Sequence, residues 1–229
     1  MESLRISPMS SSTDNKLMCF YEALLDHFGP QHWWPGQSPF EVMVGAVLTQ
    51  NTNWSNVEKA IKNLKNAQAL TPERINNLTH EELAQLIRPA GYFNIKAKRL
   101  KNFIRWFCSD YNASIESLRE LSVDRLREEL LSINGIGRET ADSIILYALE
   151  KLTFVVDTYT YRILLRHGCI DSDSDYERTK EYCQANLPDD IAVYNELHAL
   201  IVRTGKIHCK PRPACLECPL ARFSHDVEA

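Results

Sequence analysis

A glycine-rich turn between two helical segments is the feature that most restricts how this chain can fold. Residues 130–157 have the sequence LLSINGIGRETADSIILYALEKLTFVVD. Gly135 and Gly137 can adopt left-handed backbone angles at little steric cost, so a very short turn between two helices is feasible. Apolar residues recur at helical spacing directly after the turn, which predicts that a second helix begins immediately.

The start of that second helix is a candidate anion site. Unpaired backbone N–H groups at a helix N-terminus favour a phosphate and do not distinguish one base from another. An ordinary helix–glycine–helix corner explains the same residues, and the turn alone leaves both interpretations open. A short apolar run, 154–156, then places Asp157 about one helix length after the turn. Asp157 is either the N-cap of the next helix or a carboxylate that does chemistry.

Helical periodicity elsewhere predicts an all-α protein with short helices and short connections. The run 154–156 is the only candidate strand, and we expect the last helix to end at Gly205 as its C′ residue. The predicted helices are 16–28, 40–48, 81–87, 96–107, 115–121, 123–133, 160–167, 176–186 and 191–204, with two more that begin near Trp54 and Pro72.

Length and charge restrict the class of protein. A chain of 229 residues can form one large or two small domains. A net charge of −4 argues against coating nucleic acid by bulk charge. A local basic cluster is still present, and it is either a nucleic-acid face or a solvated helix face. Its members are Lys96, Lys98, Arg99, Lys101 and Arg105.

No apolar run approaches the length of a membrane span, and the N-terminus lacks the apolar core of a signal peptide. We therefore expect a cytoplasmic protein with no membrane partner. Seven cysteines without a secretion signal do not indicate a disulfide framework. Cys209, Cys215 and Cys218 are closely spaced near the C-terminus, which favours metal binding over disulfides.

Two adjacent tryptophans, Trp33 and Trp34, lie in a loop bounded by proline and glycine. One helix face or one strand face cannot bury both rings. The loop is therefore either a plug that seals two helices or an aromatic surface for a ligand.

The hairpin and Asp157 together resemble the helix-hairpin-helix (HhH-GPD) DNA glycosylase superfamily, of the endonuclease III kind. In that family a Leu/Ile-x-Gly-Ile-Gly-x-x-Thr-Ala hairpin grips the DNA backbone, and the Asp of Val-Asp-Thr acts at the sugar. The resemblance implies a monomer that acts on damaged double-stranded DNA. Gln50 matches a residue that fills the gap left by an extruded base. The implied DNA-binding residues are Gln50, Gly135, Ile136, Gly137, Arg138 and Thr140.

The resemblance also implies two helical domains with an active-site cleft between them. Residues 37–152 would form a bundle with the hairpin, because their helices are contiguous. Residues 1–36 plus 153–229 would form the second domain. Asp157 would then be the catalytic residue on one wall of the cleft.

The residue at position 139 indicates whether the enzyme also cleaves the DNA strand. Bifunctional relatives carry a lysine there, in Gly-x-Lys-Thr-Ala, which forms a Schiff base with the sugar. This chain has Glu139, and a carboxylate cannot form an imine. We therefore predict a monofunctional, hydrolytic DNA glycosylase of base excision repair.

The Trp-Trp-Pro and Gly-Ile-Gly-x-Glu segments resemble endonuclease III-related 3-methyladenine DNA glycosylases. That resemblance implies a base pocket formed by Trp33, Trp34, Pro35, Trp54 and Glu139. Aromatic faces attract cationic alkylated purines through cation–π interactions. A glycosylase for mismatched or oxidised pyrimidines is the alternative enzyme, and a non-catalytic DNA-binding module is the alternative from another class.

The family carries an iron–sulfur cluster held by four cysteines at the position of Cys209, Cys215 and Cys218. In this chain the expected fourth cysteine is Ser224, with His225 and Asp226 beside it. Three states are open: a [4Fe-4S] cluster with a ligand other than cysteine, a zinc site, or no metal. We favour the cluster.

Overall fold

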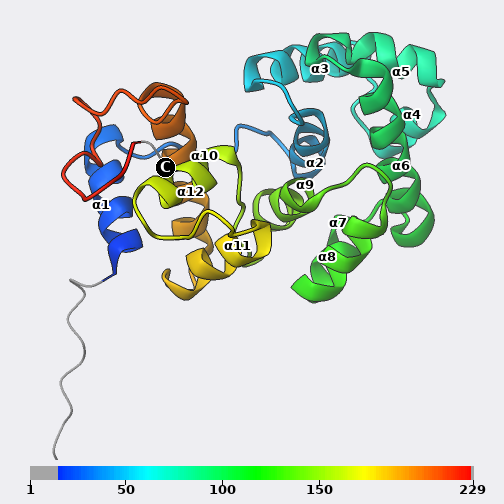
Figure 1. Cartoon of the computed structure of the whole chain (residues 1–229). Coiled ribbons are helices and arrows are strands. Elements are labelled where there is room, and N and C mark those ends of the chain that lie inside the picture. The colour runs from blue at the N-terminus through cyan, green and yellow to red at the C-terminus, as the bar shows by residue number, and fades with distance from the viewer. Residues whose placement is uncertain (1–14, 228–229) are drawn as a thin grey trace, which may run out of the picture.

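The computed structural model describes residues 15–227, and over that range its regular structure is entirely helical (Figure 1). The elements are α1 (Lys16–Phe28), α2 (Pro39–Leu48), α3 (Trp54–Asn66), α4 (Pro72–Asn77), α5 (His80–Leu86), η1 (Arg88–Ala90), α6 (Phe93–Tyr111), α7 (Ile115–Glu120), α8 (Val123–Ser132), α9 (Arg138–Ser143), η2 (Ile144–Ala148), α10 (Thr158–Arg166), α11 (Tyr176–Ala185) and α12 (Ile191–Ile207). The predicted all-α fold is confirmed.

The helices gather in two bodies. Figure 1 shows α2 to α9 in one body, and α1, α10, α11 and α12 with the C-terminal segment in the other. The central helix of the first body is α2, whose residues 41–48 are all buried and which packs against α3, α6 and η2. In the second body α12 packs against both α1 and α10. We propose 37–152 and 1–36 plus 153–229 as the domain boundaries, with residues 1–14 and 228–229 outside the described part of the chain.

Two local predictions are wrong. Residues 154–156 pair with no strand in the described range; they form a buried connection to α10. Helix α12 does not end at Gly205 but continues through it to Ile207. A Cβ at Gly205 would lie 2.2 Å from Cδ1 of Tyr159. The missing side chain therefore lets α10 and α12 pack closely, which is a tertiary role and not a capping role.

Two of the five residues in the predicted basic cluster do not contribute to an exposed basic face, whereas Lys98 and Arg105 are exposed. Lys96 is buried, and its Nζ donates to the carbonyls of Leu48 (2.9 Å) and Ala90 (2.7 Å). Burial lowers the pKa of Lys96 to about 8. Lys101 donates to the carbonyl of Asn76 at the end of α4, at 2.8 Å. Both amines satisfy helix-terminal carbonyls, so they contribute to folding and not to a charged surface.

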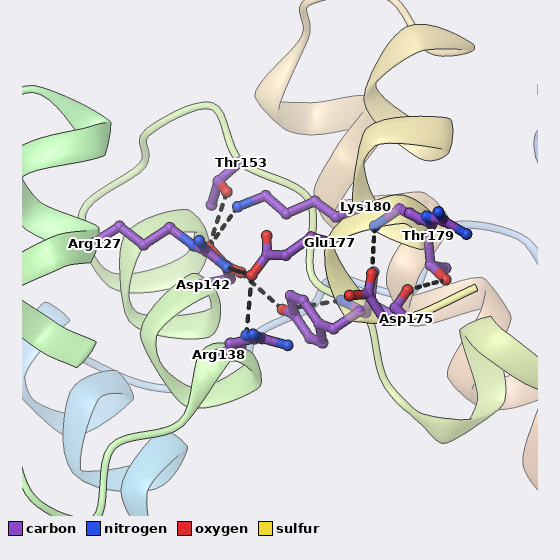
Figure 2. Close-up of polar contacts among 11 residues, drawn as sticks. Arg127, Arg138, Asp142, Thr153, Asp175, Glu177, Thr179 and Lys180 are labelled. Carbon is purple, nitrogen blue, oxygen red and sulfur yellow. Dashed lines mark hydrogen bonds and ion pairs between the residues drawn. The ribbon is translucent and has the colours of Figure 1, made fainter. Parts of the chain in front are cut away.

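A buried charge cluster joins the two bodies (Figure 2). The carboxylate of Asp142 is fully buried and accepts hydrogen bonds from Nε of Arg127 on α8 (2.9 Å) and Nζ of Lys180 on α11 (2.8 Å). The hydroxyls of Thr153 (3.1 Å) and Tyr176 (2.8 Å) complete its shell. Because its partners come from both bodies, Asp142 fixes α11 against the hairpin helix α9.

None of the helices within residues 15–227 combines the length and the apolar character that crossing a membrane would require.

Candidate active site

A cavity of about 1050 Å³ lies where the two bodies meet. Its wall comes from the loop before α2, the segment before α3, the hairpin, and the facing sides of α10 and α12. Most residues singled out in the sequence line this one cavity. They are Trp33, Trp34, Gln50, Trp54, Gly135, Ile136, Gly137, Arg138, Glu139, Thr140 and Asp157.

Pro35 is the exception among the predicted pocket residues. It is exposed and does not line the cavity. The chain turns tightly here, because the backbone N–H of Gly36 donates to the carbonyl of Trp34 at 2.9 Å. That turn carries Pro35 outward while the preceding rings face inward.

The two hairpin glycines have different roles. Gly135 has a φ of +100°, and a Cβ there would lie 2.3 Å from Cγ of Arg99. Gly137 has a φ of −97°, so the expected left-handed angle at this position is wrong. It is instead the N-cap of α9, and a Cβ added there would meet nothing within 4 Å. The hairpin therefore presents the start of α9 to open space, as an anion site requires.

Gln50 fastens the loop after α2 to the hairpin. Its Nε2 donates to the carbonyl of Gly135 (3.1 Å) and to Oγ1 of Thr140 (2.9 Å). Its Oε1 accepts a hydrogen bond from the guanidinium of Arg99. Thr140 is buried in this contact. The sequence placed Arg99 only in a general basic cluster and gave no signal for this bond.

Asp157 has the N-cap role that the sequence left open, and its catalytic role stays a prediction. As the N-cap of α10, its Oδ1 accepts hydrogen bonds from the backbone N–H (2.7 Å) and Oγ1 (2.9 Å) of Thr160. Its Oδ2 takes no part in the cap and lies 3.9 Å from Nε2 of His198. One carboxylate oxygen therefore caps the helix, and the other lies outside the cap.

His198 and Tyr147 are cavity neighbours that the sequence analysis missed. His198 lies buried on α12, and its Nδ1 shares a 2.5 Å hydrogen bond with the hydroxyl of Tyr147. Burial lowers the pKa of His198, although Asp157 opposes that shift. Tyr147 belongs to η2, a π-helical segment of a kind that is common at functional sites. A histidine in the apolar run LHALIV was the only available sequence signal.

Glu139 lies in the first turn of α9, and both Glu139 and Asp157 line the cavity. Glu139 is partly exposed to solvent, yet the cavity wall around its carboxyl group displaces enough water to raise its pKa to about 7. The carboxylate of Asp157 contributes to the same shift by repulsion. Glu139 therefore changes charge near neutral pH.

The three tryptophans form one aromatic cluster. The ring centroids of Trp34 and Trp54 are 4.9 Å apart at 83°, and those of Trp33 and Trp34 are 5.2 Å apart at 68°. Trp34 also contacts Tyr147, with ring centroids 5.0 Å apart. A Cβ on Gly45 would lie 3.2 Å from the Trp54 ring, so α2 supports the cluster closely. The rings pack against one another and also line the cavity, and their use as a ligand surface stays a prediction.

The cysteine segment lies apart from this cavity. Cys209, Cys215 and Cys218 line a small cavity of about 20 Å³, and His225 lies in its wall. Ser224 does not; its carbonyl accepts a hydrogen bond from Nδ1 of His167 at 3.1 Å. The backbone N–H of Asp226 donates to the carbonyl of Arg166 at 2.7 Å.

The donor groups of that small cavity are thiols and imidazoles. Three of each line it, and the imidazoles are those of His167, His208 and His225. Within residues 15–227, however, no three His, Cys, Asp or Glu side chains are grouped closely enough to bind one metal ion.

Comparison with known proteins identifies the family. Residues 44–189 match the model of the HhH-GPD superfamily of base excision DNA repair proteins. A protein of Methanocaldococcus jannaschii, named as a candidate DNA repair glycosylase, is 48% identical over 205 residues, which are 89% of this chain and 93% of the relative. Endonuclease III of Thermotoga maritima is 33% identical over 181 residues, 79% of each chain.

Among solved structures, 3-methyladenine DNA glycosylase of Helicobacter pylori, bound to 1,N6-ethenoadenine, aligns with a TM-score of 0.71 at 31% identity. The alignment covers 83% of this chain and 95% of that protein. These matches confirm the family, the two-domain helical fold and the enzyme class that the hairpin and Asp157 indicated. The chain belongs to the HhH-GPD superfamily and is a DNA glycosylase of base excision repair.

Proposed function

We propose that this glycosylase is monofunctional and removes alkylated purines such as 3-methyladenine from double-stranded DNA by hydrolysis. One observation carries the proposal: the tryptophan cluster lines the same cavity as Glu139 and Asp157. An extruded cationic purine would find electron-rich rings beside two carboxyl groups in that cavity. Both features favour a positive charge.

The hairpin and the Gln50 segment would hold the duplex. The start of α9, with Gly135 to Arg138, would bind a backbone phosphate, which fixes position without reading sequence. Gln50 would fill the gap left by the extruded base. Its bonds to Gly135 and Thr140 attach this wedge to the element that holds the phosphate. Extrusion costs a few kcal/mol of stacking, and a damaged base costs least.

Asp157 would act at the sugar. As the glycosidic bond breaks, its electron pair leaves with the base and positive charge develops at C1′. Oδ2 of Asp157, which the helix cap leaves free, would stabilise that charge and accept a proton from the attacking water. A cationic alkylated base departs neutral, so no strong general acid is needed.

Glu139 would exclude the lyase route and favour the charged substrate. A carboxylate forms no imine, so no covalent link to the sugar can arise at this position. With a pKa of about 7, Glu139 is partly ionised at neutral pH and would attract a cationic purine. We also propose a monomer, because one chain supplies every wall of the cavity.

Cys209, Cys215 and Cys218 would hold a [4Fe-4S] cluster, with His225 as the fourth ligand. Nδ1 of His225 is hydrogen-bonded to the carbonyl of Phe223 at 2.8 Å, which leaves Nε2 as the ligand atom. Such a cluster would supply thiolate–iron bonds that cross-link the C-terminal segment. Its broad absorption near ~400 nm and its iron content distinguish it from zinc.

The test is a panel of duplexes that contain 3-methyladenine, hypoxanthine, uracil opposite guanine, or thymine glycol, each assayed with and without alkali. We expect fastest release of 3-methyladenine, with strand breaks only after alkali. Faster release of uracil or thymine glycol would favour the pyrimidine alternative, to which the similarity with endonuclease III points. Strand breaks without alkali, together with a borohydride-trapped adduct, would contradict hydrolysis.

A further inference from the structure

One buried ring nitrogen of His198 makes no hydrogen bond within residues 15–227 and lies near the proposed catalytic carboxylate. Its Nε2 is shielded from solvent and has no hydrogen-bond partner in the described part of the chain. The nearest carboxylate oxygen is Oδ2 of Asp157, at 3.9 Å. Buried polar atoms are seldom left without a partner in folded proteins, so this one requires a functional explanation.

The other ring nitrogen determines which proton His198 carries. Tyr147 hydrogen-bonds to Nδ1 of His198, and the indole of Trp33 beside its hydroxyl can only donate. If Nδ1 donated, the buried Tyr147 proton would be unpaired and an Nε2 lone pair would face the Asp157 carboxylate. If Tyr147 donates, Nε2 carries the proton and points it toward Oδ2. Only the second arrangement pairs the Tyr147 proton and also directs an N–H toward the Asp157 carboxylate.

The surroundings keep both groups in those protonation states. Burial raises the pKa of Tyr147 well above its usual value, so the phenol retains its proton. Burial lowers the pKa of His198, so the imidazole is neutral at physiological pH. A neutral donor can orient a carboxylate without cancelling its negative charge.

We propose that His198 is a positioning residue for Asp157, and that its Nε2–H closes onto Oδ2 when damaged DNA binds. This inference rests on the proposed catalytic role of Asp157. Thr160 already holds Oδ1 through two hydrogen bonds. A bond from His198 would fix the second oxygen and so set the plane of the carboxylate beneath C1′. Catalytic hydrogen bonds are often long in free enzymes and shorten in the substrate complex.

Two variants of His198 separate positioning from packing. In His198→Asn, the amide oxygen can still accept the Tyr147 proton, but no donor reaches the place of Nε2. In His198→Gln, the longer amide can place an N–H near that position. We expect single-turnover base release to fall about tenfold to a hundredfold in His198→Asn, since a misplacement of about 1 Å can cost that much. His198→Gln should recover most of the loss.

A double-mutant cycle tests whether the effect passes through Asp157. The readout is binding of a duplex that contains a cationic pyrrolidine in place of the target sugar, a mimic of the charged intermediate. We expect His198→Asn to weaken this binding in the wild-type background and to have no effect in Asp157→Asn. Binding to undamaged duplex and the melting temperature should stay the same in both backgrounds.

Three results would overturn the inference. The first is release by His198→Asn within threefold of wild type. The second is an equal loss of pyrrolidine affinity in both backgrounds, which would indicate packing. The third is failure of His198→Gln to recover more activity than His198→Asn while it melts at the wild-type temperature. If Asp157→Asn itself releases base normally, the proposed function fails first, and that single variant shows it.

Discussion

Replacing Asp142 with asparagine should destabilise the protein strongly, although the new side chain has nearly the same shape. The carboxylate is 0% exposed and accepts from Arg127, Thr153, Tyr176 and Lys180. Asparagine keeps one acceptor oxygen but removes the negative charge. Arg127 and Lys180, whose side chains are 18% and 10% exposed, would then face an uncharged amide. Removing one partner of a buried ion pair costs about 3–5 kcal/mol.

The structure favours the lower end of that range. Arg127 retains a second partner, because its guanidinium also contacts Oε1 of Glu177 at 2.8 Å. Within residues 15–227 the Lys180 amine contacts no second carboxylate, so most of the lost unfolding free energy should come from this amine. We therefore expect Asp142→Asn to lose about 3 kcal/mol of unfolding free energy. For a chain of this size that corresponds to a Tm lower by about 6–12 °C.

Glu177→Gln is the matched control. Glu177 belongs to the same cluster and also contacts Nε of Arg138 at 3.1 Å, but its side chain is 35% exposed. A partly solvated ion pair contributes about 0–1 kcal/mol. Urea denaturation of wild type and both variants at one pH measures the difference. A loss below about 1 kcal/mol in Asp142→Asn, or equal losses in the two variants, would refute the reasoning.

Four further results are expected at the cavity. Asp157→Asn should bind DNA normally but release base at least a hundredfold more slowly, and a rate within about tenfold of wild type, or 1.4 kcal/mol, would contradict its role. Activity on a cationic base should rise as pH increases through about 7, because Glu139 gains its negative charge there, and Glu139→Gln should remove that rise. Gly135→Ala should cost about 1–3 kcal/mol of stability in a urea titration, since a Cβ conflicts with both φ and Arg99. Trp54→Ala should weaken activity on 3-methyladenine by about 1–3 kcal/mol without changing affinity for undamaged duplex, which gel-shift assays can check.

Several helix starts were predictable because their determinants are local, whereas the predicted helix 96–107 extends from Phe93 to Tyr111. Ser38, Asn53 and Thr79 each accept a hydrogen bond from a backbone N–H three residues later, and each starts a helix. These are the residue types that N-caps favour. The predicted helix 16–28 matches α1 at both ends. Such signals need only a few neighbouring residues, and one sequence contains them.

The contacts that organise the cavity were not predictable, because their partners are distant in the chain. Gln50 and Gly135 are 85 residues apart, and Tyr147 and His198 are 51 apart. Nothing local distinguishes Asp142 from an ordinary helical aspartate until the fold brings Lys180 beside it. The family resemblance predicted most of the residues that line the cavity. It did not supply the hydrogen bonds that set the orientation of each side chain.

Helix α10 connects the two sites that the sequence indicated separately. Asp157 caps its N-terminus at the cavity, and Arg166 ends it beside the cysteines. Arg166 donates to the carbonyls of Lys210 (2.8 Å) and Pro211 (3.1 Å) and to Sγ of Cys209 (3.3 Å). Arg162, one turn earlier, donates to the carbonyl of Cys209 at 2.8 Å. A metal group held by these cysteines would therefore brace the helix that carries the proposed catalytic carboxylate, Asp157, and it would influence base release through position and not through chemistry at the sugar.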